Sequence, residues 1–105
     1  MIKKISAEEF RNEAMKDERA VIDFSATWCG PCKMLGPVIA DISEELTDAK
    51  FYNVDVDDSQ ELAMKYGIMS VPTVLILKNG EEAGRLVGFQ PKEIMKQAIQ
   101  EKLGQ

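Results

Sequence analysis

Hydrophobic and polar residues follow two repeating patterns along the chain, and together they predict alternating strands and helices. Short, nearly continuous apolar runs are bounded by charged or turn-forming residues, as in AVIDFS at residues 20–25. Such runs are typical of strands that are covered on both faces of a sheet. We expect strands at residues 2–5, 20–25, 51–56, 73–78 and 81–87.

Longer segments repeat their apolar residues every three or four positions, which is typical of helices with one buried face. We expect a first helix, capped by Ser6 and Glu9, that ends near residue 16. Helices should follow at residues 32–47 and 59–66, and Pro91 opens the last one. The residues expected to face the core are Met34, Leu35, Val38, Ile39, Ile42 and Leu46 in the long helix, and Ile94, Met95, Ala98, Ile99 and Leu103 in the last.

The order of these elements predicts an α/β fold, built as one domain over residues 1–105. The strand–helix–strand units at the start of the chain should place their strands parallel. Asn79-Gly80 is a strong hairpin signal, so residues 81–87 should run antiparallel to residues 73–78. Gly84 suggests a β-bulge or close packing. The expected result is a central mixed β-sheet flanked by helices on both faces.

Charge and hydropathy exclude several classes of partner. The 105 residues include 13 basic and 18 acidic ones, for a formal charge of −5, which argues against nucleic acid as a main partner. No apolar run approaches the ~20 residues needed to cross a bilayer. The first residues, MIKKI, are followed at once by acidic sequence and do not resemble a signal peptide. We therefore expect a cytoplasmic protein without a membrane anchor.

The two cysteines of the chain, Cys29 and Cys32, are the main candidates for chemistry. They could form a redox dithiol, half of a metal site or an inert structural pair. Zinc usually takes four Cys or His ligands, and the chain has no His and no third Cys. A structural disulfide across so short a loop would remove little chain entropy. In a reducing compartment such a pair is more often catalytic than structural, so the redox interpretation is favoured.

The predicted helix gives the redox pair a mechanism. Pro31 suits a first helical turn, so Cys29 should lie at the positive end of the helix dipole, where its thiolate is stabilised. Cys29 is thus the expected nucleophile, and Cys32, inside the first turn and less exposed, the expected resolving cysteine. Gly30 leaves room for a partner's backbone, and Trp28 offers an apolar flank.

Asp23 interrupts the apolar strand that precedes the cysteines. If its carboxyl group is buried, its pKa should be raised. Because the chain has no His, such a carboxyl group is the obvious candidate to transfer protons near neutral pH. The alternative is a surface-facing residue on a half-buried strand.

The WCGPC motif and its surroundings resemble the thioredoxin family over essentially the whole chain. The residues that carry this resemblance are Asp23-Phe24, Trp28 to Met34, Pro37, Tyr66-Gly67-Ile68, Val71-Pro72-Thr73, Lys78-Asn79-Gly80 and Val87-Gly88. The resemblance implies the thioredoxin fold and a monomer that reduces protein disulfides, with Gly30 and Pro31 tuning the potential. A thioredoxin reductase, which carries FAD and NADPH, would restore the dithiol, so this chain would bind no cofactor of its own.

The resemblance also implies roles for residues outside the motif. Asp23 would assist Cys32, and Val71-Pro72 would be a cis peptide beside the disulfide. An extended substrate could then pair with the Val71 backbone. The apolar docking rim would consist of Trp28, Gly30, Pro31, Val71, Pro72, Gly88 and Phe89.

Two residues near the site depart from the family's pattern. Ser25 stands where many members carry a second Trp, and Asn53 where many carry a Lys near the buried acid. Without that cation, the pKa of Asp23 should be higher still. Asp55, Asp57 and Asp58 could form a metal cluster, but strand-end capping fits them better because no Gly-containing calcium loop surrounds them.

Two alternatives to a reductase stay open on the sequence. A protein of this fold could run in the opposite direction, as an oxidase or isomerase, because the direction depends on redox potential. The domain could also serve as a non-catalytic binding subunit of a larger complex, using the docking rim without turnover.

Overall fold

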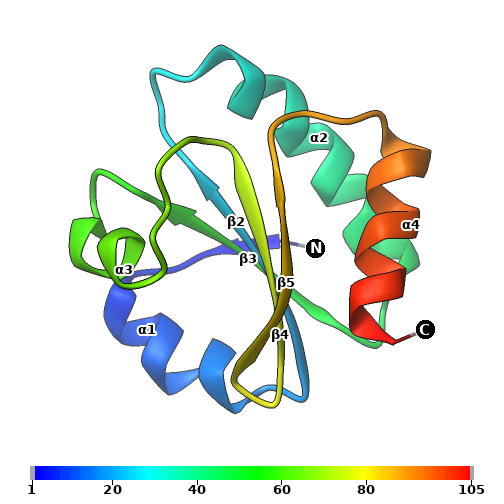
Figure 1. The fold of residues 1–105 in the computed structure, drawn as a ribbon, viewed down its shortest axis with the longest axis horizontal. Coiled ribbons are helices and arrows are strands. Elements are labelled where there is room, and N and C mark those ends of the chain that lie inside the picture. Colours follow the sequence, from blue (N-terminus) through cyan, green and yellow to red (C-terminus); the bar gives the residue numbers. More distant parts are fainter. Residues whose placement is uncertain (1, 105) are drawn as a thin grey trace.

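The computed structural model describes residues 2–104, in which five strands form one mixed sheet in the order β1-β3-β2-β4-β5 (Figure 1). The strands are β1 (Ile2–Lys4), β2 (Arg19–Ser25), β3 (Lys50–Asp55), β4 (Thr73–Lys78) and β5 (Glu81–Val87). β3 runs parallel to both β1 and β2. β4 runs antiparallel to β2 and to β5, so the antiparallel part of the sheet begins one strand earlier than the hairpin alone indicated.

Helices cover both faces of the sheet, as expected for this element order. The four α-helices are α1 (Ala7–Asn12), α2 (Gly30–Glu45), α3 (Gln60–Lys65) and α4 (Lys92–Leu103). In Figure 1, α1 and α3 lie on one side of the sheet and α2 and α4 on the other. The sequence prediction of an α/β fold with a mixed, doubly covered sheet is therefore confirmed.

The central strand β2 is buried on both faces because its side chains alternate between two apolar layers. Ile22 and Phe24 join a cluster with Phe10 of α1, whereas Val21 packs with Leu35 and Ile39 of α2. Alternation between two covered faces explains why this strand reads as a continuous apolar run.

The hairpin between β4 and β5 and the bulge in β5 follow the two signals in the sequence. Asn79 and Gly80 both have positive φ angles, of 52° and 81°, as a two-residue hairpin of this type requires. The register shifts between Ile76 and Leu77, and Gly84 lies opposite Ile76. A Cβ atom at Gly84 would lie only 2.6 Å from the Lys102 side chain, so this glycine marks both a bulge and a close contact.

Three sequence expectations about the helices are wrong in detail. The first α-helix ends at Asn12, and a 3₁₀ turn (Ala14–Lys16) completes the segment. The long helix begins at Gly30, two residues before Cys32, because Cys29 itself caps it. Met34 and Ile94, expected in the core, are 58% and 56% exposed, because each directly precedes a buried residue, Leu35 or Met95, and so points about 100° away from it around the helix.

Gly80 and Gly36 give a test of the fold that changes one methyl group at a time. Gly80→Ala would place a Cβ atom 2.8 Å from the Met15 backbone oxygen at a positive φ, so we expect a loss of about 1–3 kcal/mol in the free energy of unfolding. Gly36→Ala, in α2 with no atom within 4 Å of the added carbon, should instead gain about 0.5–1 kcal/mol. Denaturant unfolding measures both, and equal effects would contradict the hairpin geometry.

Candidate active site

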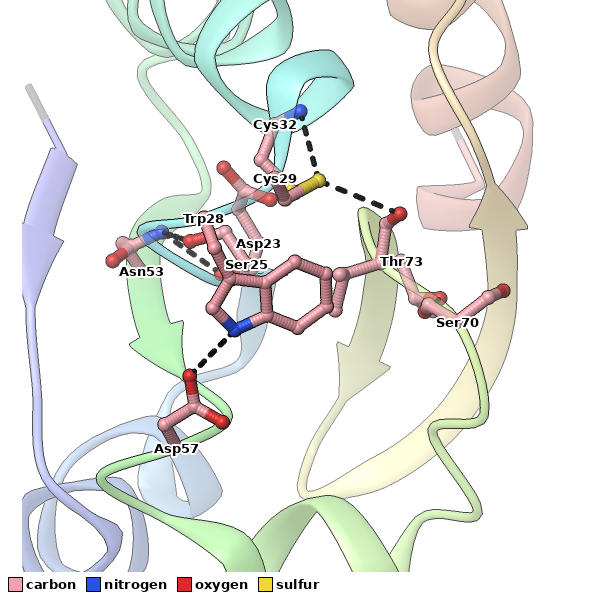
Figure 2. The surroundings of a disulfide bond; sticks show 10 residues. Asp23, Ser25, Trp28, Cys29, Cys32, Asn53, Asp57, Ser70 and Thr73 are labelled. Atoms are coloured by element: carbon pink, nitrogen blue, oxygen red, sulfur yellow. Dashed lines mark hydrogen bonds between the residues drawn. A yellow bond between two sulfur atoms is a disulfide. The ribbon is translucent and has the colours of Figure 1, made fainter.

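Cys29 and Cys32 form a disulfide at the start of α2, where the chain leaves β2 (Figure 2). Cys29 has an extended backbone and acts as the N-cap, and its Sγ accepts a hydrogen bond of 3.2 Å from the Cys32 backbone N–H. Pro31 lies in the first turn of the helix, where its missing N–H leaves no hydrogen bond unmade. The sequence therefore placed the pair correctly at a helix N-terminus.

Both cysteines are buried, with exposed fractions of 5% for Cys29 and 7% for Cys32. In the disulfide form the two cysteines are thus about equally buried, so the expected difference in exposure between Cys32 and Cys29 is not seen. The pair packs in a small apolar cluster with Ala26, and the half-buried side chains of Val56 and Val71 lie against it. Val56 and Val71 belong to segments far from Cys29 in the sequence. The prediction that Cys29 lies at a helix N-terminus could therefore not show that they cover it.

The loop before β4 approaches the disulfide from the other side. Val71-Pro72 is a cis peptide, as the resemblance implied, and the Val71 carbonyl oxygen lies 3.7 Å from the Cys29 Sγ. The Thr73 hydroxyl donates to the Ser70 carbonyl oxygen at 2.7 Å, and the Gly88 N–H donates to the Pro72 carbonyl oxygen at 2.9 Å. The end of β5 is thereby tied to the proline loop.

Asp23 is buried on β2, with an exposed fraction of 3%. By alternation with Val21, its side chain faces the α2 layer, where it lines a cleft of about 260 Å³ together with Cys32. Its Oδ1 atom has no hydrogen-bond partner among the described residues. The alternative of a surface-facing Asp23 is therefore wrong.

Burial raises the pKa of Asp23 to about 6 from an ordinary value near 3.8, and the nearby Asn53 amide offsets only part of that rise. The physical cause is that the surroundings of the carboxyl group solvate the charged form poorly. A carboxylic acid with this pKa exchanges protons in the pH range that an ordinary His would cover. Asp23, which lines the same cleft as Cys32, can therefore hold a proton near neutral pH.

The two departures from the family's pattern contact each other. The Asn53 side-chain Nδ2 donates to the Ser25 Oγ at 2.8 Å and to the Asp23 backbone oxygen at 3.1 Å (Figure 2). Asn53 pairs in register with Asp23, on the adjacent parallel strand. Sequence reasoning noted both residues but could not join them, because the register between β2 and β3 is not visible in the sequence.

Trp28 lies beside the disulfide with 69% of its surface exposed, and its indole N–H donates to the Asp57 carboxylate at 2.8 Å. Asp55 accepts the backbone N–H groups of Asp57 and Asp58, so it caps the end of β3. Among residues 2–104, no group of His, Cys, Asp and Glu side chains is arranged to hold a metal ion. The capping interpretation is confirmed for Asp55 alone, because the Asp57 side chain accepts from Trp28 and the Asp58 side chain pairs with Lys4.

The expected docking rim is only partly a continuous surface. Trp28 and Val71 line one shallow cleft of about 150 Å³ with Met69, whose side chain is almost fully exposed. Gly30 and Pro31 are exposed, Val71, Gly88 and Phe89 are half-buried, and Pro72 is buried. Phe89 packs against the apolar layer beneath α2 and α4. Pro72 and Phe89 therefore support the surface near the disulfide more than they present it.

A disulfide that caps a helix, beside a cis-proline loop and over a buried acid, defines a thiol–disulfide oxidoreductase. The thioredoxin family model matches residues 1–101. Thioredoxin-1 of Saccharomyces cerevisiae is 46% identical over 94 residues, 90% of each chain, and the Bacillus subtilis thioredoxin is 49% identical over 82 residues, 77% of this chain and 79% of its own. This chain belongs to the thioredoxin family.

Solved structures agree with this assignment. A thioredoxin variant from Halobacterium salinarum superposes with a TM-score of 0.88 at 34% identity, covering 97% of this chain and 90% of that one. The Plasmodium falciparum thioredoxin gives a TM-score of 0.89 at 36% identity, covering 94% and 97%. The thioredoxin fold expected from the resemblance is confirmed.

Membership in this family makes the chain a protein-disulfide reductase whose redox carrier is its own Cys29–Cys32 pair, with no separate cofactor. Proteins of this kind act on disulfides in other proteins and are themselves reduced again by a reductase. No helix within residues 2–104 is both long enough and apolar enough to span a bilayer.

The raised pKa of Asp23 predicts an unusual dependence of stability on pH. The folded chain holds this proton more tightly than the unfolded chain, so the group costs nothing below about pH 4. As pH rises from about 4 to above 6, the buried group must ionise, and the free energy of unfolding should fall by about 3 kcal/mol.

Asp23→Asn should remove this pH-dependent loss, so the variant should be the more stable protein at pH 7. Denaturant unfolding of both oxidised proteins between pH 4 and 7 measures the difference. Asp41→Asn, at an exposed position on α2, controls for the loss of one negative charge. If Asp23→Asn and Asp41→Asn follow the wild-type pH curve equally, the burial argument is wrong.

Proposed function

We propose that this protein reduces disulfides with Cys29 as the nucleophile, Cys32 as the resolving cysteine and Asp23 as the proton acceptor and donor for Cys32. One observation carries the proposal: Cys32, from the disulfide at the start of α2, and the buried carboxyl group of Asp23, whose Oδ1 atom has no partner among the described residues, line the same cleft. The assignment of each role follows from the groups that surround each sulfur.

The surroundings of Cys29 favour its thiolate. Its Sγ lies at the N-terminus of a 16-residue helix and accepts the Cys32 N–H. The helix dipole and this hydrogen bond both stabilise negative charge there. In the reduced protein, the Cys29 thiolate attacks one sulfur of a substrate disulfide. A Cys29–substrate disulfide forms, and the other substrate sulfur leaves as a thiolate.

Cys32 completes the reaction with the help of Asp23. The Cys32 thiol gives its proton to the Asp23 carboxylate and attacks the Cys29 sulfur. The bond between Cys29 and the substrate breaks, the substrate sulfur of that bond leaves as a thiolate, and the Cys29–Cys32 disulfide forms. When a reductase opens that disulfide, the protonated Asp23 returns the proton to the Cys32 thiolate. An acid with a pKa of about 6 serves both directions, because neither of its forms is rare near neutral pH.

The docking rim is the proposed site for the substrate chain. Trp28, Gly30 and Pro31 offer exposed surface next to the sulfurs, and Val71, Pro72, Gly88 and Phe89 support it from the other side. The backbone of Val71 reaches to within 3.7 Å of the Cys29 Sγ, so an extended substrate paired with that backbone would bring its own disulfide close to the nucleophile.

The oligomeric state, compartment and partners of the protein are proposed from its family and its net charge. The chain acts as one domain over residues 1–105, as a monomer in the cytoplasm. A thioredoxin reductase that carries FAD and NADPH restores its dithiol. The formal charge of −5 makes nucleic acid an unsuitable partner.

The first test is the thiol–disulfide equilibrium against glutathione. We expect the Cys29–Cys32 pair to be more reducing than glutathione and Cys29→Ser to abolish reduction of a protein disulfide. Cys32→Ser should instead accumulate the Cys29–substrate disulfide, which mass spectrometry detects. A pair more oxidising than glutathione would reverse the proposed direction, and the absence of exchange would favour a binding subunit.

The second test addresses Asp23. Because an amide cannot take up the thiol proton, Asp23→Asn should slow the resolving step about tenfold to a hundredfold at pH 7. The dependence of that step on ionisation near pH 6 should disappear as well. Stopped-flow reduction of a protein disulfide at several pH values measures both. An Asp23→Asn variant with the wild-type rate and pH profile would refute the role, and Asp41→Asn serves as the charge control.

A further inference from the structure

Ser25 and Asn53 form part of the wall of the Asp23 cleft. Asn53 pairs in register with Asp23 on one side and with Lys4 on the other, so these three residues form a row across β2, β3 and β1. Side chains that are paired in register share one face of the sheet. The amide of Asn53 is therefore the neutral donor group next to the buried acid.

Two well-formed hydrogen bonds of the Asn53 amide go to neutral acceptors, the Asp23 backbone oxygen at 3.1 Å and the Ser25 Oγ at 2.8 Å. A backbone carbonyl group can only accept, so the amide must turn its NH₂ group toward it. That NH₂ group has two N–H bonds, and these two acceptors use both. Its contact with the Asp23 carboxyl group, which still lowers the pKa of that group, must share an N–H that is already donated to one of these acceptors.

The Asp23 carboxyl group shows the consequence. Its Oδ1 atom is buried without a partner, although a side-chain donor belongs to the neighbouring residue in register. An N–H donated to this oxygen would stabilise the carboxylate and lower its pKa. The Asn53 amide does lower the pKa of this carboxyl group by hydrogen bonding, but it offsets only part of the rise that burial causes, because its N–H groups are shared with two neutral acceptors.

We propose that Ser25 is a positioning residue that draws the Asn53 amide toward its own hydroxyl group, weakens the donation of this amide to the Asp23 carboxyl group and thereby keeps this acid able to hold a proton for Cys32. The inference deepens the proposed function, on which the link to Cys32 rests. Ser25 acts through Asn53 and touches neither sulfur. Losing its hydroxyl group would free one N–H of Asn53 to turn toward the buried carboxylate.

Other charged groups near Asp23 would not account for a change in its titration when Ser25 is replaced. Lys4 of β1, Lys33 of α2 and Asp55 of β3 face the cleft, and β4 presents the apolar Val74 opposite Asp23. Lys4 forms an ion pair with Asp58 at 3.5 Å, and its side chain is mostly exposed. None of these groups changes when Ser25 is replaced, so a shift in the Asp23 titration reports on Asn53.

The test is the pH titration of the Asp23 carboxyl carbon, followed by NMR in the oxidised protein and assigned with Asp23→Asn. We expect Ser25→Ala to lower the titration midpoint by about one pH unit, because an ionised acceptor gains a hydrogen bond. Ser25→Thr keeps a hydroxyl group and should retain the wild-type midpoint. In an Asn53→Leu background, which lacks the amide, Ser25→Ala should no longer lower the midpoint.

An unchanged midpoint in Ser25→Ala would overturn the inference. So would an equal fall in the Asn53→Leu background, because that result would assign the effect to water entering the cleft. The pH profile of the resolving step separates this inference from the proposed function. If the midpoint falls in Ser25→Ala while that profile stays in place, Ser25 positions Asn53 as inferred and the role of Asp23 for Cys32 fails instead.

Discussion

The burial of one carboxyl group is the constraint on which the rest of this site depends. Asp23 lies on the central strand β2, between β3 and β4 and below the start of α2. The apolar layers on both faces of that strand provide the stability that allows one ionisable group to be buried among them. The same burial sets the pH range in which the group can exchange protons.

The connection between β2 and α2 places the buried acid close to the reactive sulfurs. Only a few residues separate the buried acid from Cys29, so one short segment holds an acid below the helix and a capped sulfur at its first turn. The two sulfurs therefore experience different fields. Backbone N–H groups favour negative charge at Cys29, and Cys32 shares a cleft with the Asp23 carboxyl group, which is its proton partner in the function proposed above.

Much of this arrangement could be predicted from the sequence, since it depends on local patterns. The apolar run of β2, the hairpin signal at Asn79-Gly80 and the pairing of Pro31 with a helix start each identify their own element. The place of Asp23 inside that run favoured its burial, and the alternative of a surface-facing residue was excluded only by the apolar layers on both faces of β2. The prediction that Met34 faces the core failed because Met34 and Leu35 are adjacent and both apolar, so the spacing of apolar residues does not show which of the two is buried.

The remaining contacts depend on how distant segments meet. The Trp28–Asp57 and Ser25–Asn53 hydrogen bonds each join residues almost thirty positions apart, and both depend on where β3 lies beside β2. The burial of Cys29 depends likewise on the Val71 loop. Such contacts require strand register and loop packing, which a single sequence does not encode in any local pattern.

The position of Trp28 gives the protein an intrinsic optical signal. It is the only tryptophan of the chain, and it is mostly exposed and next to the disulfide, with its indole held by Asp57. All tryptophan emission therefore originates within a few residues of the bond that opens and closes during the reaction. A disulfide is an efficient quencher of a nearby excited indole, so the unlabelled molecule carries a fluorophore that reports its own oxidation state.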